Sequence, residues 1–380
     1  MLMQKWIALL LACALLAGCA PAPRAPEETT VPTVPVYNTM TAEEAMQEMT
    51  IGWNLGNTFD APEGELSWGN PMTTQEMIQK LYDLGFRTLR IPVSWHRHVD
   101  EAPEYTIDET FLKRVETVVN YGLELGMYVI INSHHDNEIY IPTAENKDRA
   151  EAYLRAVWAQ VAAHFEYADH HLIFQTMNEP RVVGTSYEWN IDTGNEDCMA
   201  AIDIINGLNQ AVLDTIRATG GRNADRFVII SPYAGNHMAT LIDRFQMPTD
   251  TAENKLILSV HAYTPYNLCL NTNSDEAEFG ISHLTEIKGF MKKVNYRYVR
   301  NGIPVIIDEM GIINKHNPEA RYAWAKAYVA AAKEYGMVCC WWDNGEVNGT
   351  GENFGILNRR KLEVHPDSQS VYEGLMAGLE

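Results

Sequence analysis

The strongest constraint on the fold is a repeated alternation of short apolar runs with longer segments of helical periodicity, which fills the chain from about residue 38 to residue 380. The helical segments include residues 73–85, 109–126, 150–168, 201–221 and 318–336, and several of them end in glycine, as helix C-termini prefer. The short runs number eight: IGWNLGN (51–57), RTLRIPV (87–93), MYVIINSHH (127–135), HLIFQTMNE (171–179), RFVIISP (226–232), LILSVHAY (256–263), PVIIDEMG (304–311) and MVCCWWDNG (337–345).

This alternation predicts the fold class. Short apolar strands that alternate with helices indicate parallel strands buried on both faces of a sheet. Eight such units predict an α/β fold, a (β/α)8 TIM barrel, as a single catalytic domain over residues 38–380. The alternative is a doubly wound open sheet, which is disfavoured because no glycine-rich phosphate loop follows any of the runs.

The N-terminus has the features of an export signal. Lys5 is followed by the apolar stretch WIALLLACALLAG, which is too short for an ordinary membrane-spanning helix. Its end, LAGC (16–19), resembles the bacterial lipoprotein signal, which implies that residues 1–18 are removed and a lipid is attached to Cys19. Residues 19–37, rich in proline and threonine, would then form a tether. We therefore expect an exported protein anchored by lipid to the bacterial cell envelope; the alternative is a plain secretory signal with an incidental cysteine.

Charge and cysteine spacing narrow the possible ligands. The formal net charge of −21 repels phosphate backbones, so we expect no nucleic-acid partner, whereas a neutral sugar is compatible with it. The four cysteines beyond the N-terminal region have no CxxC spacing, so neither a zinc site nor a disulfide framework is predicted. Adjacent Cys339 and Cys340 lie in an apolar run and are expected in the core. We expect no cofactor, no metal and a monomer.

Polar side chains close six of the eight runs. Active sites of (β/α)8 barrels lie at the C-terminal ends of the strands. A single histidine or arginine at such a place is more often a structural hydrogen-bonding residue, but the recurrence on six strands indicates a site. The residues are Arg90, His134, His135, Asp136, Asn178, Glu179, His261, Tyr263, Asp308, Glu309, Trp341, Trp342 and Asp343.

Two of these carboxylates form the expected catalytic pair. Pro180 favours an extended conformation for the residue before it, so the strand should continue through Glu179 and hold its carboxylate at the barrel mouth. Glu309 closes a strand that lies across the barrel. Two carboxylates that flank a bond are what glycoside hydrolysis requires, and we predict the short gap of about 5–5.5 Å that retaining enzymes show. The alternative is a structural pair of ion-paired glutamates.

Several motifs together resemble glycoside hydrolase family 5. They are NEP (178–180), Glu309, RIPVSW (90–95), HAY (261–263) and WWDNG (341–345). A resemblance to its subfamily 4 rests on GWNLGNTFDA (52–61), residues 67–95, SVHAYTPYNLCLN (259–271) and GENFGILNR (351–359). The resemblance covers about residues 40–380 and implies a retaining endo-β-1,4-glucanase acting on cellulose, mixed-linkage β-glucan or xyloglucan.

The resemblance also implies residue roles. Glu179 would be the general acid/base and Glu309 the nucleophile. The expected substrate-binding residues are Arg90, which supports the nucleophile, Asn178, which binds a 2-hydroxyl, Trp342, which stacks beneath a sugar, and His134, His135, His261 and Tyr263. Arg90 should keep Glu309 ionised, and the pKa of Glu179 should be raised. Asp308 stands where the family commonly has glycine, and strand alternation predicts that it points away from the site.

Other interpretations remain open. The protein could be an endo-acting xyloglucanase or a β-mannanase of the same family, or a non-catalytic surface glycan-binding protein; the presence of both carboxylates disfavours the last. The run His134–His135–Asp136 could be read as metal ligands, but neighbours on a strand face opposite sides. Tyr140, Trp189 and Tyr266 lie in loops after the strands and are candidates for stacking on sugars.

Overall fold

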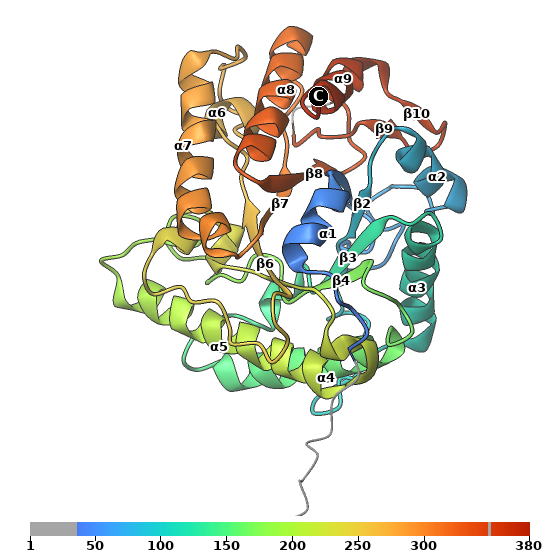
Figure 1. Cartoon of the computed structure of the whole chain (residues 1–380), viewed down its shortest axis with the longest axis vertical. Coiled ribbons are helices and arrows are strands. Elements are labelled where there is room, and N and C mark those ends of the chain that lie inside the picture. The colour runs from blue at the N-terminus through green and yellow to red at the C-terminus, as the bar shows by residue number, and fades with distance from the viewer. Residues whose placement is uncertain (1–35, 349–350) are drawn as a thin grey trace, which may run out of the picture. The chain divides into compact units, whose positions relative to one another are not determined.

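The computed structural model describes residues 36–348 and 351–380. The proposed signal peptide, the lipidation site Cys19 and nearly all of the proposed tether lie outside the described residues. Eight parallel strands close into a barrel in chain order, which confirms the predicted (β/α)8 fold (Figure 1). The strands are β1 (Ile51–Leu55), β2 (Thr88–Ile91), β3 (Tyr128–Asn132), β4 (Leu172–Gln175), β5 (Val228–Ile230), β6 (Leu256–His261), β7 (Val305–Met310) and β8 (Met337–Asp343).

Helices surround the barrel and follow nearly every strand. They are α1 (Ala42–Met49), which precedes β1, then α2 (Gln75–Asp83), α3 (Glu109–Leu123), α4 (Lys147–His164), α5 (Glu196–Ala218), α6 (Tyr266–Cys269), α7 (Ile281–Arg297), α8 (Pro318–Glu334) and α9 (Gln369–Ala377). The five helical segments expected from periodicity correspond to α2, α3, α4, α5 and α8. Two short 3-10 turns replace the helix between β5 and β6, and a small two-stranded sheet, β9 (Leu357–Asn358) and β10 (Glu363–Val364), follows β8.

Local sequence signals explain where the outer helices begin. The side chain of Thr74 accepts a hydrogen bond from the backbone N–H of Met77 at the start of α2, and Asn195 does the same for Cys198 at the start of α5. Each cap satisfies one of the backbone donors that a helix N-terminus leaves unpaired. Pro318 opens α8, where its missing N–H costs nothing.

The barrel is closed at one end by an apolar plug. A cluster joins α1 to the beginnings of the strands and contains Ala42, Ala45, Met46, Met49, Tyr128, Ile130, Ile173, Phe227, Ile229, Ile257, Ile306, Val338 and Cys340. Gly52 is needed here because a Cβ atom at that position would lie 2.2 Å from the Cys340 sulfur. Figure 1 shows α1 over the strands in the middle of the ring of helices, so ligands must enter from the other end.

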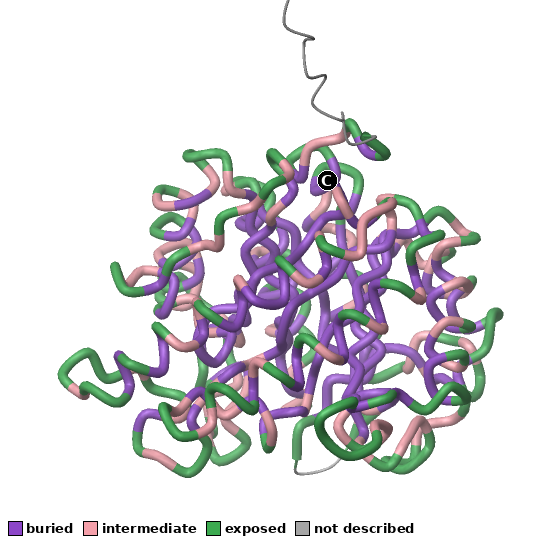
Figure 2. Tube along the Cα trace, turned by 90° about the horizontal axis from the view of Figure 1, so that it is seen from below, coloured by how far each residue is buried: buried purple, intermediate pink, exposed green. Residues whose placement is uncertain are grey.

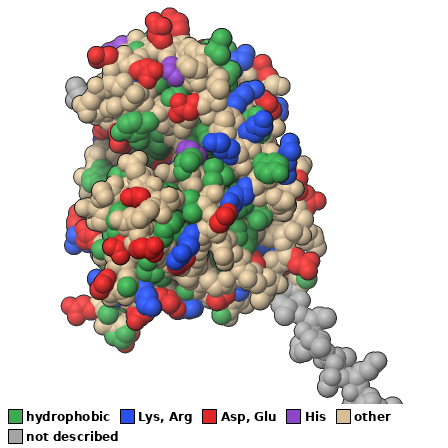
Figure 3. All heavy atoms as spheres, turned by 90° about the vertical axis from the view of Figure 1, so that its left-hand side faces the viewer, with side chains coloured by type: hydrophobic (Ala, Val, Ile, Leu, Met, Phe, Trp, Pro, Cys, Tyr) green, Lys and Arg blue, Asp and Glu red, His purple; other side chains and the backbone are tan. Residues whose placement is uncertain are grey.

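Burial follows this architecture. The strands in the middle are buried, and the exposed positions gather on loops and the outer sides of helices (Figure 2). Cys339 and Cys340 are buried, as expected of core residues. On the face drawn in Figure 3, acidic and basic side chains are interspersed with hydrophobic ones. Among the described residues, no helix combines the length and hydropathy that a membrane span needs.

Candidate active site

Arg90 is fully buried at the centre of the polar end of the barrel. Its Nη1 atom donates to Glu309 Oε1 at 2.7 Å and to Asn54 Oδ1 at 2.8 Å. Its Nη2 atom donates to Asn178 Oδ1 at 2.6 Å, and its Nε atom donates to Gln175 Oε1 at 2.9 Å. All three guanidinium nitrogens are thus engaged with groups from β1, β4 and β7 or the turns that follow. Such charge-assisted bonds hold the Glu309 carboxylate in one orientation.

Glu179 lies at the mouth, four residues after Gln175 ends β4 and directly before Pro180, so the strand does not continue through it as expected. Its Oε1 atom lies 2.8 Å from His261 Nδ1, and its Oε2 atom lies 3.8 Å from Arg181 Nη1. Because the Oδ1 atom of neighbouring Asn178 is taken by Arg90, the Nδ2 group of Asn178 remains as a donor beside the carboxylate.

The two carboxylates face each other across a short gap. Oxygen atoms of Glu179 and Glu309 and a ring nitrogen of His261 lie within 4.8 Å of one another. The Tyr263 hydroxyl donates to Glu309 Oε2 at 3.2 Å, on the side of the carboxylate that faces His261. The separation agrees with the predicted short gap and is too small for the roughly 6.5–9.5 Å of inverting enzymes.

The charge distribution in the ligand-free site differs from the sequence prediction. Burial raises the pKa of Glu309, with added repulsion from Glu179 and Asp308, although His261 and Arg90 oppose the rise. Burial would also raise the pKa of Glu179, but the hydrogen bond and charge of His261 outweigh it and lower that pKa. The expected rise in the pKa of Glu179 is therefore wrong for this state, whereas Arg90 does lower the pKa of Glu309, although burial outweighs it.

His261 is the physical reason for this reversal. Burial alone would lower the pKa of His261, but the carboxylates of Glu309, Asp308 and Glu179 raise it to about 9. At neutral pH the imidazolium carries the proton that the sequence had assigned to Glu179. That proton lies one 2.8 Å hydrogen bond away from the Glu179 carboxylate.

Asp308 does not point away from the site as predicted. The pairing of β7 with β8 shifts register between Ile307 and Met310, and this irregularity lets consecutive side chains face the barrel interior. Asp308 Oδ2 accepts from Gln175 Nε2 at 2.7 Å, and Oδ1 accepts from Ser259 Oγ at 2.7 Å. Asp308 is therefore part of the buried polar layer beneath Glu309.

The two tryptophans of β8 have separate positions. The Trp342 ring lies parallel to the His134 ring, with centroids 5.8 Å apart, at the mouth. The Trp341 ring is fully buried, with its centroid 6.4 Å from that of Trp324 on α8, and its Nε1 atom donates to the Phe354 carbonyl at 2.8 Å. The choice of Trp342 as the site residue therefore agrees with the geometry.

His134 and His135 reach different surroundings. Burial lowers the pKa of His134 well below its ordinary value, so its imidazole is neutral. His135 lies further out, with its ring 5.9 Å from that of Trp68. Asp136 faces elsewhere and accepts from the Trp95 backbone N–H at 2.9 Å, so the three adjacent residues do not converge as metal ligands. His134 and His135 do approach Asp60, whose carboxylate oxygens already accept two backbone N–H groups.

The loop aromatics divide into two groups. Tyr140 is fully buried and donates through its hydroxyl to the His134 carbonyl at 2.6 Å, so the expectation that it stacks on sugars is wrong. Trp189 and Tyr266 are 47% and 60% exposed and remain free to contact a ligand. Trp68, 44% exposed beside His135, is an aromatic residue of the mouth that the sequence analysis did not select.

Known proteins share this sequence and fold. The family model described as cellulase (glycosyl hydrolase family 5) matches residues 47–348. The chain belongs to glycoside hydrolase family 5. Endoglucanase A of Ruminococcus albus is 42% identical over 338 residues, which cover 87% of this chain and 91% of that protein. Cellulase/esterase CelE of Acetivibrio thermocellus is 41% identical over 89% of this chain, which spans only 40% of the relative's length.

Solved structures of family 5 agree with the fold and refine the resemblance. A GH5-4 broad specificity endoglucanase from Ruminococcus champanellensis with bound cellotriose is 42% identical, has a TM-score of 0.85 and covers 90% of this chain and 99% of that chain. A glycoside hydrolase 5 lichenase variant from Caldicellulosiruptor sp. F32 in complex with cellotetraose is 38% identical, with a TM-score of 0.86 and coverage of 91% and 97%. The predicted resemblance to family 5 and its subfamily 4 is confirmed.

Some buried residues of this family 5 site were not predicted. Asn54, Gln175 and Ser259 lie inside apolar runs and bind the charged groups directly below the mouth. The signal available was a polar residue in the interior of an otherwise apolar strand, because such a side chain needs a partner when buried.

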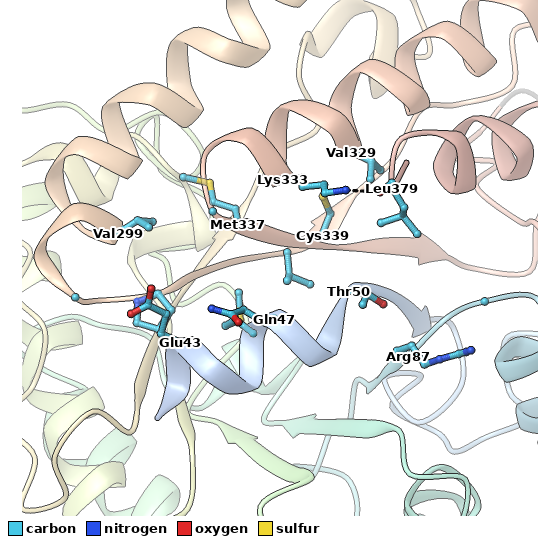
Figure 4. Close-up of a pocket in the computed structure, with 16 residues that line it drawn as sticks. Glu43, Gln47, Thr50, Arg87, Val299, Val329, Lys333, Met337, Cys339 and Leu379 are labelled. Atoms are coloured by element: carbon cyan, nitrogen blue, oxygen red, sulfur yellow. Dashed lines mark hydrogen bonds between the residues drawn. The ribbon is translucent and has the colours of Figure 1, made fainter. Parts of the chain in front are cut away.

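An apolar cavity of this family 5 barrel lies away from the carboxylate pair. It has a volume of about 590 Å³ and lies at the α1 end, where Glu43 and Gln47 of α1 approach Met337 and Cys339 of β8 (Figure 4). Glu43 is its only acidic lining residue among those described. It lacks a second carboxylate and is not a hydrolytic site.

Proposed function

We propose that the protein is an endo-β-1,4-glucanase that cleaves internal bonds of cellulose and mixed-linkage β-glucan with retention of anomeric configuration. The observation that carries this proposal is the short gap between the Glu179 and Glu309 carboxylates at the open end of the barrel. The endoglucanase names of the relatives, and the cellotriose and cellotetraose bound to similar barrels, support a glucan substrate. The proposed substrates also include xyloglucan.

In the first step, a Glu309 oxygen attacks the anomeric carbon and the bond to the leaving oxygen breaks. Glu179 donates a proton to that oxygen, so the leaving sugar departs as a neutral alcohol. Arg90 and Tyr263 hold Glu309 through separate oxygens at 2.7 and 3.2 Å, which fixes the direction of attack. The product of this step is a glycosyl ester on Glu309.

The second step reverses these roles. Glu179, now a carboxylate, takes a proton from a water molecule that attacks the anomeric carbon, and Glu309 leaves as a carboxylate. Two inversions at the same carbon give net retention. At the end of the cycle Glu179 and Glu309 have returned to their starting protonation states.

His261 supplies the proton that Glu179 must hold before the first step. A sugar in the mouth displaces water around Glu179, and this desolvation favours the neutral carboxylic acid. The proton can then pass from His261 Nδ1 to Glu179 Oε1 along their 2.8 Å contact. Formation of the ester removes the Glu309 charge, which weakens the attraction that raises the pKa of His261.

Around this pair, the remaining residues bind the substrate. The Trp342 ring offers a flat face beneath the sugar next to the cleavage point, with neutral His134 beside it. The Nδ2 group of Asn178 is placed to donate to a sugar hydroxyl. His135 lies further along the mouth with Trp68.

Initial rates measured side by side on carboxymethyl cellulose, barley β-glucan, xyloglucan, mannan and xylan test the proposal. We expect the highest rates on the β-1,4-glucans, and loss of activity in Glu309→Ala. Exposed Glu373→Gln is the matched control and should behave as wild type. A wild-type protein that binds these glucans and releases no reducing ends would instead be a glycan-binding protein, and one fastest on mannan would be a mannanase.

We also propose that the mature protein is a monomer held at the bacterial cell envelope by a lipid on Cys19. The support is the LAGC sequence at the end of a short apolar stretch. Metabolic labelling with a fatty-acid analogue should label the wild type and Cys13→Ser but not Cys19→Ser. Equal labelling of all three would contradict the anchor.

A further inference from the structure

We propose that Arg181 is a positioning residue that ties a sugar platform, the Trp189 indole, to the acid–base carboxylate Glu179. The role rests on the proposed function, because it concerns the sugar that departs when Glu179 donates its proton. Arg181 follows directly after the NEP motif, in the segment between β4 and α5.

The Arg181 side chain contacts both the backbone and the side chain of Glu179. Its Nη1 atom donates to the Glu179 carbonyl at 3.1 Å and lies 3.8 Å from Glu179 Oε2. The Arg181 side chain is only 12% exposed, so solvent screens its charge weakly. Arg181 therefore acts on both the position and the ionisation of the carboxylate.

The other side of Arg181 holds the loop that carries Trp189. Its Nε atom donates to Glu188 Oε1 at 3.1 Å, while Glu188 Oε2 accepts from the Gly184 backbone N–H at 2.8 Å. Through these two contacts, Glu188 links Arg181 to Gly184 within the same loop. The guanidinium carbon also lies 3.9 Å from the centre of the Trp189 ring, a cation–π contact.

Trp189 is placed to bind the departing sugar. One face of its ring is covered by Arg181, yet the residue is 47% exposed, so the rest of the indole faces the solvent. Arg181 lies between Trp189 and Glu179, 3.9 Å from the indole centre and 3.8 Å from a carboxylate oxygen, so the indole lies near the group that delivers the proton. A flat apolar face at that place suits the sugar beyond the bond that is cleaved, because aromatic side chains of this kind combine apolar surface with little conformational freedom to lose.

The charge environment of Glu179 defines how Arg181 can act. The ionisable groups near it are Arg181 on its own loop, His261 and Tyr263 from β6 and its end, Glu309 on β7, His135 and Tyr140 after β3, and Glu352 after β8. Arg181 and His261 both lower the pKa of Glu179. Removal of the Arg181 charge should therefore raise that pKa and carry the alkaline limb of the pH profile to higher pH.

Kinetics on two substrates separate this role from a purely structural one. Cellopentaose places sugars on the leaving side, whereas 2,4-dinitrophenyl β-cellobioside has a leaving group that needs neither a proton nor a sugar platform. We expect Arg181→Met to lower kcat on cellopentaose ~10-fold or more, within the range of general acid catalysis. Its pre-steady-state burst on the aryl glycoside should stay within about threefold of wild type, because that step needs no acid.

The platform and the coupling are tested in the same experiment. Trp189→Ala should raise KM for cellopentaose about tenfold and leave the aryl glycoside unchanged. In the Arg181→Met background, the same substitution should cost less than about threefold, because the indole has already lost its support. Arg181→Lys should keep the wild-type alkaline limb but show a raised KM for cellopentaose like that of Trp189→Ala, since lysine keeps the charge but lacks the planar guanidinium that supports the indole.

The control is Arg244→Met, which removes an arginine from a surface pair with Asp203, 2.5 Å apart, and should match wild type. The coupling would be overturned if Arg181→Met left the kinetics unchanged or lost the same factor on both substrates. It would also be overturned if the double variant lost the product of the factors lost by Arg181→Met and Trp189→Ala. These outcomes are read against an active wild type. A wild type that cleaves neither substrate would refute the proposed function itself.

Discussion

Replacing Arg90 by methionine is expected to destabilise the fold as well as stop the reaction. Arg90 is fully buried, and its Nη1 atom lies 2.7 Å from a Glu309 oxygen while its Nε atom lies 3.6 Å from an Asp308 oxygen. Methionine fills much of the volume but leaves the two buried carboxylates with only the His261 imidazolium, 3.5 Å from an oxygen of each, as a nearby cation. Removal of one partner from a buried pair costs about 3–5 kcal/mol of unfolding free energy.

The loss should depend on pH in a direction that follows from Glu309. Burial already raises the pKa of this group in the folded protein, and loss of Arg90 raises it further. The folded variant then binds more protons than the unfolded chain. Its stability therefore falls as the pH rises from the pKa of Glu309 in the unfolded chain to its higher pKa in the folded variant. The variant should therefore lose more unfolding free energy, relative to wild type, at pH 8 than at pH 5.

Thermal unfolding followed by circular dichroism at these two pH values measures the effect. The expected fall in Tm at pH 8 is on the order of 10 °C. Arg226→Met is the matched control, because Arg226 is equally buried but donates to backbone carbonyls and to the Asn223 side chain. It should be destabilised with a weaker pH dependence. An Arg90 variant within about 1 kcal/mol of wild type at pH 8 would refute the reasoning.

Two further predictions concern the proton at the mouth. Glu179→Gln should lose activity on glucan polymers by ~100-fold or more but lose far less of its first step on 2,4-dinitrophenyl β-cellobioside, as burst kinetics would show; equal losses would exclude Glu179 as the acid. His261→Asn removes a cation that lowers the pKa of both Glu179 and Glu309, so the acidic limb of the kcat/KM profile should move to higher pH. Unchanged limbs would contradict the role of His261.

The sequence predicted those parts of the molecule that depend on local pattern. Eight apolar runs with helices between them suffice for a closed barrel, and the ends of its strands place side chains at one mouth. Pro180 predicted that the strand would continue through Glu179, but β4 ends at Gln175 and Glu179 lies in the irregular segment that follows, still at the mouth. The position of Glu309 at the end of a strand across the barrel selected it as the partner, and motif similarity then assigned it the role of nucleophile.

What the sequence missed depends on tertiary contacts. Asp308 faces the barrel interior because the pairing of β7 with β8 is irregular, and strict alternation of side chains along a strand does not predict this. The sequence predicted Tyr140 in an accessible loop, but the chain folds it back onto the His134 carbonyl. The ionisation of Glu179 depends on His261, which is 82 residues away in sequence and meets it only in the closed barrel.

The stereochemistry of the first-formed product tests the central claim most directly. Time-resolved proton NMR of cellopentaose hydrolysis distinguishes the two anomers of the newly formed reducing end before they interconvert. Retention by Glu179 and Glu309 predicts that the β-anomer forms first, in keeping with carboxylate oxygens within 4.8 Å of each other. Initial release of the α-anomer would show inversion and contradict the assignment of Glu309 as the nucleophile.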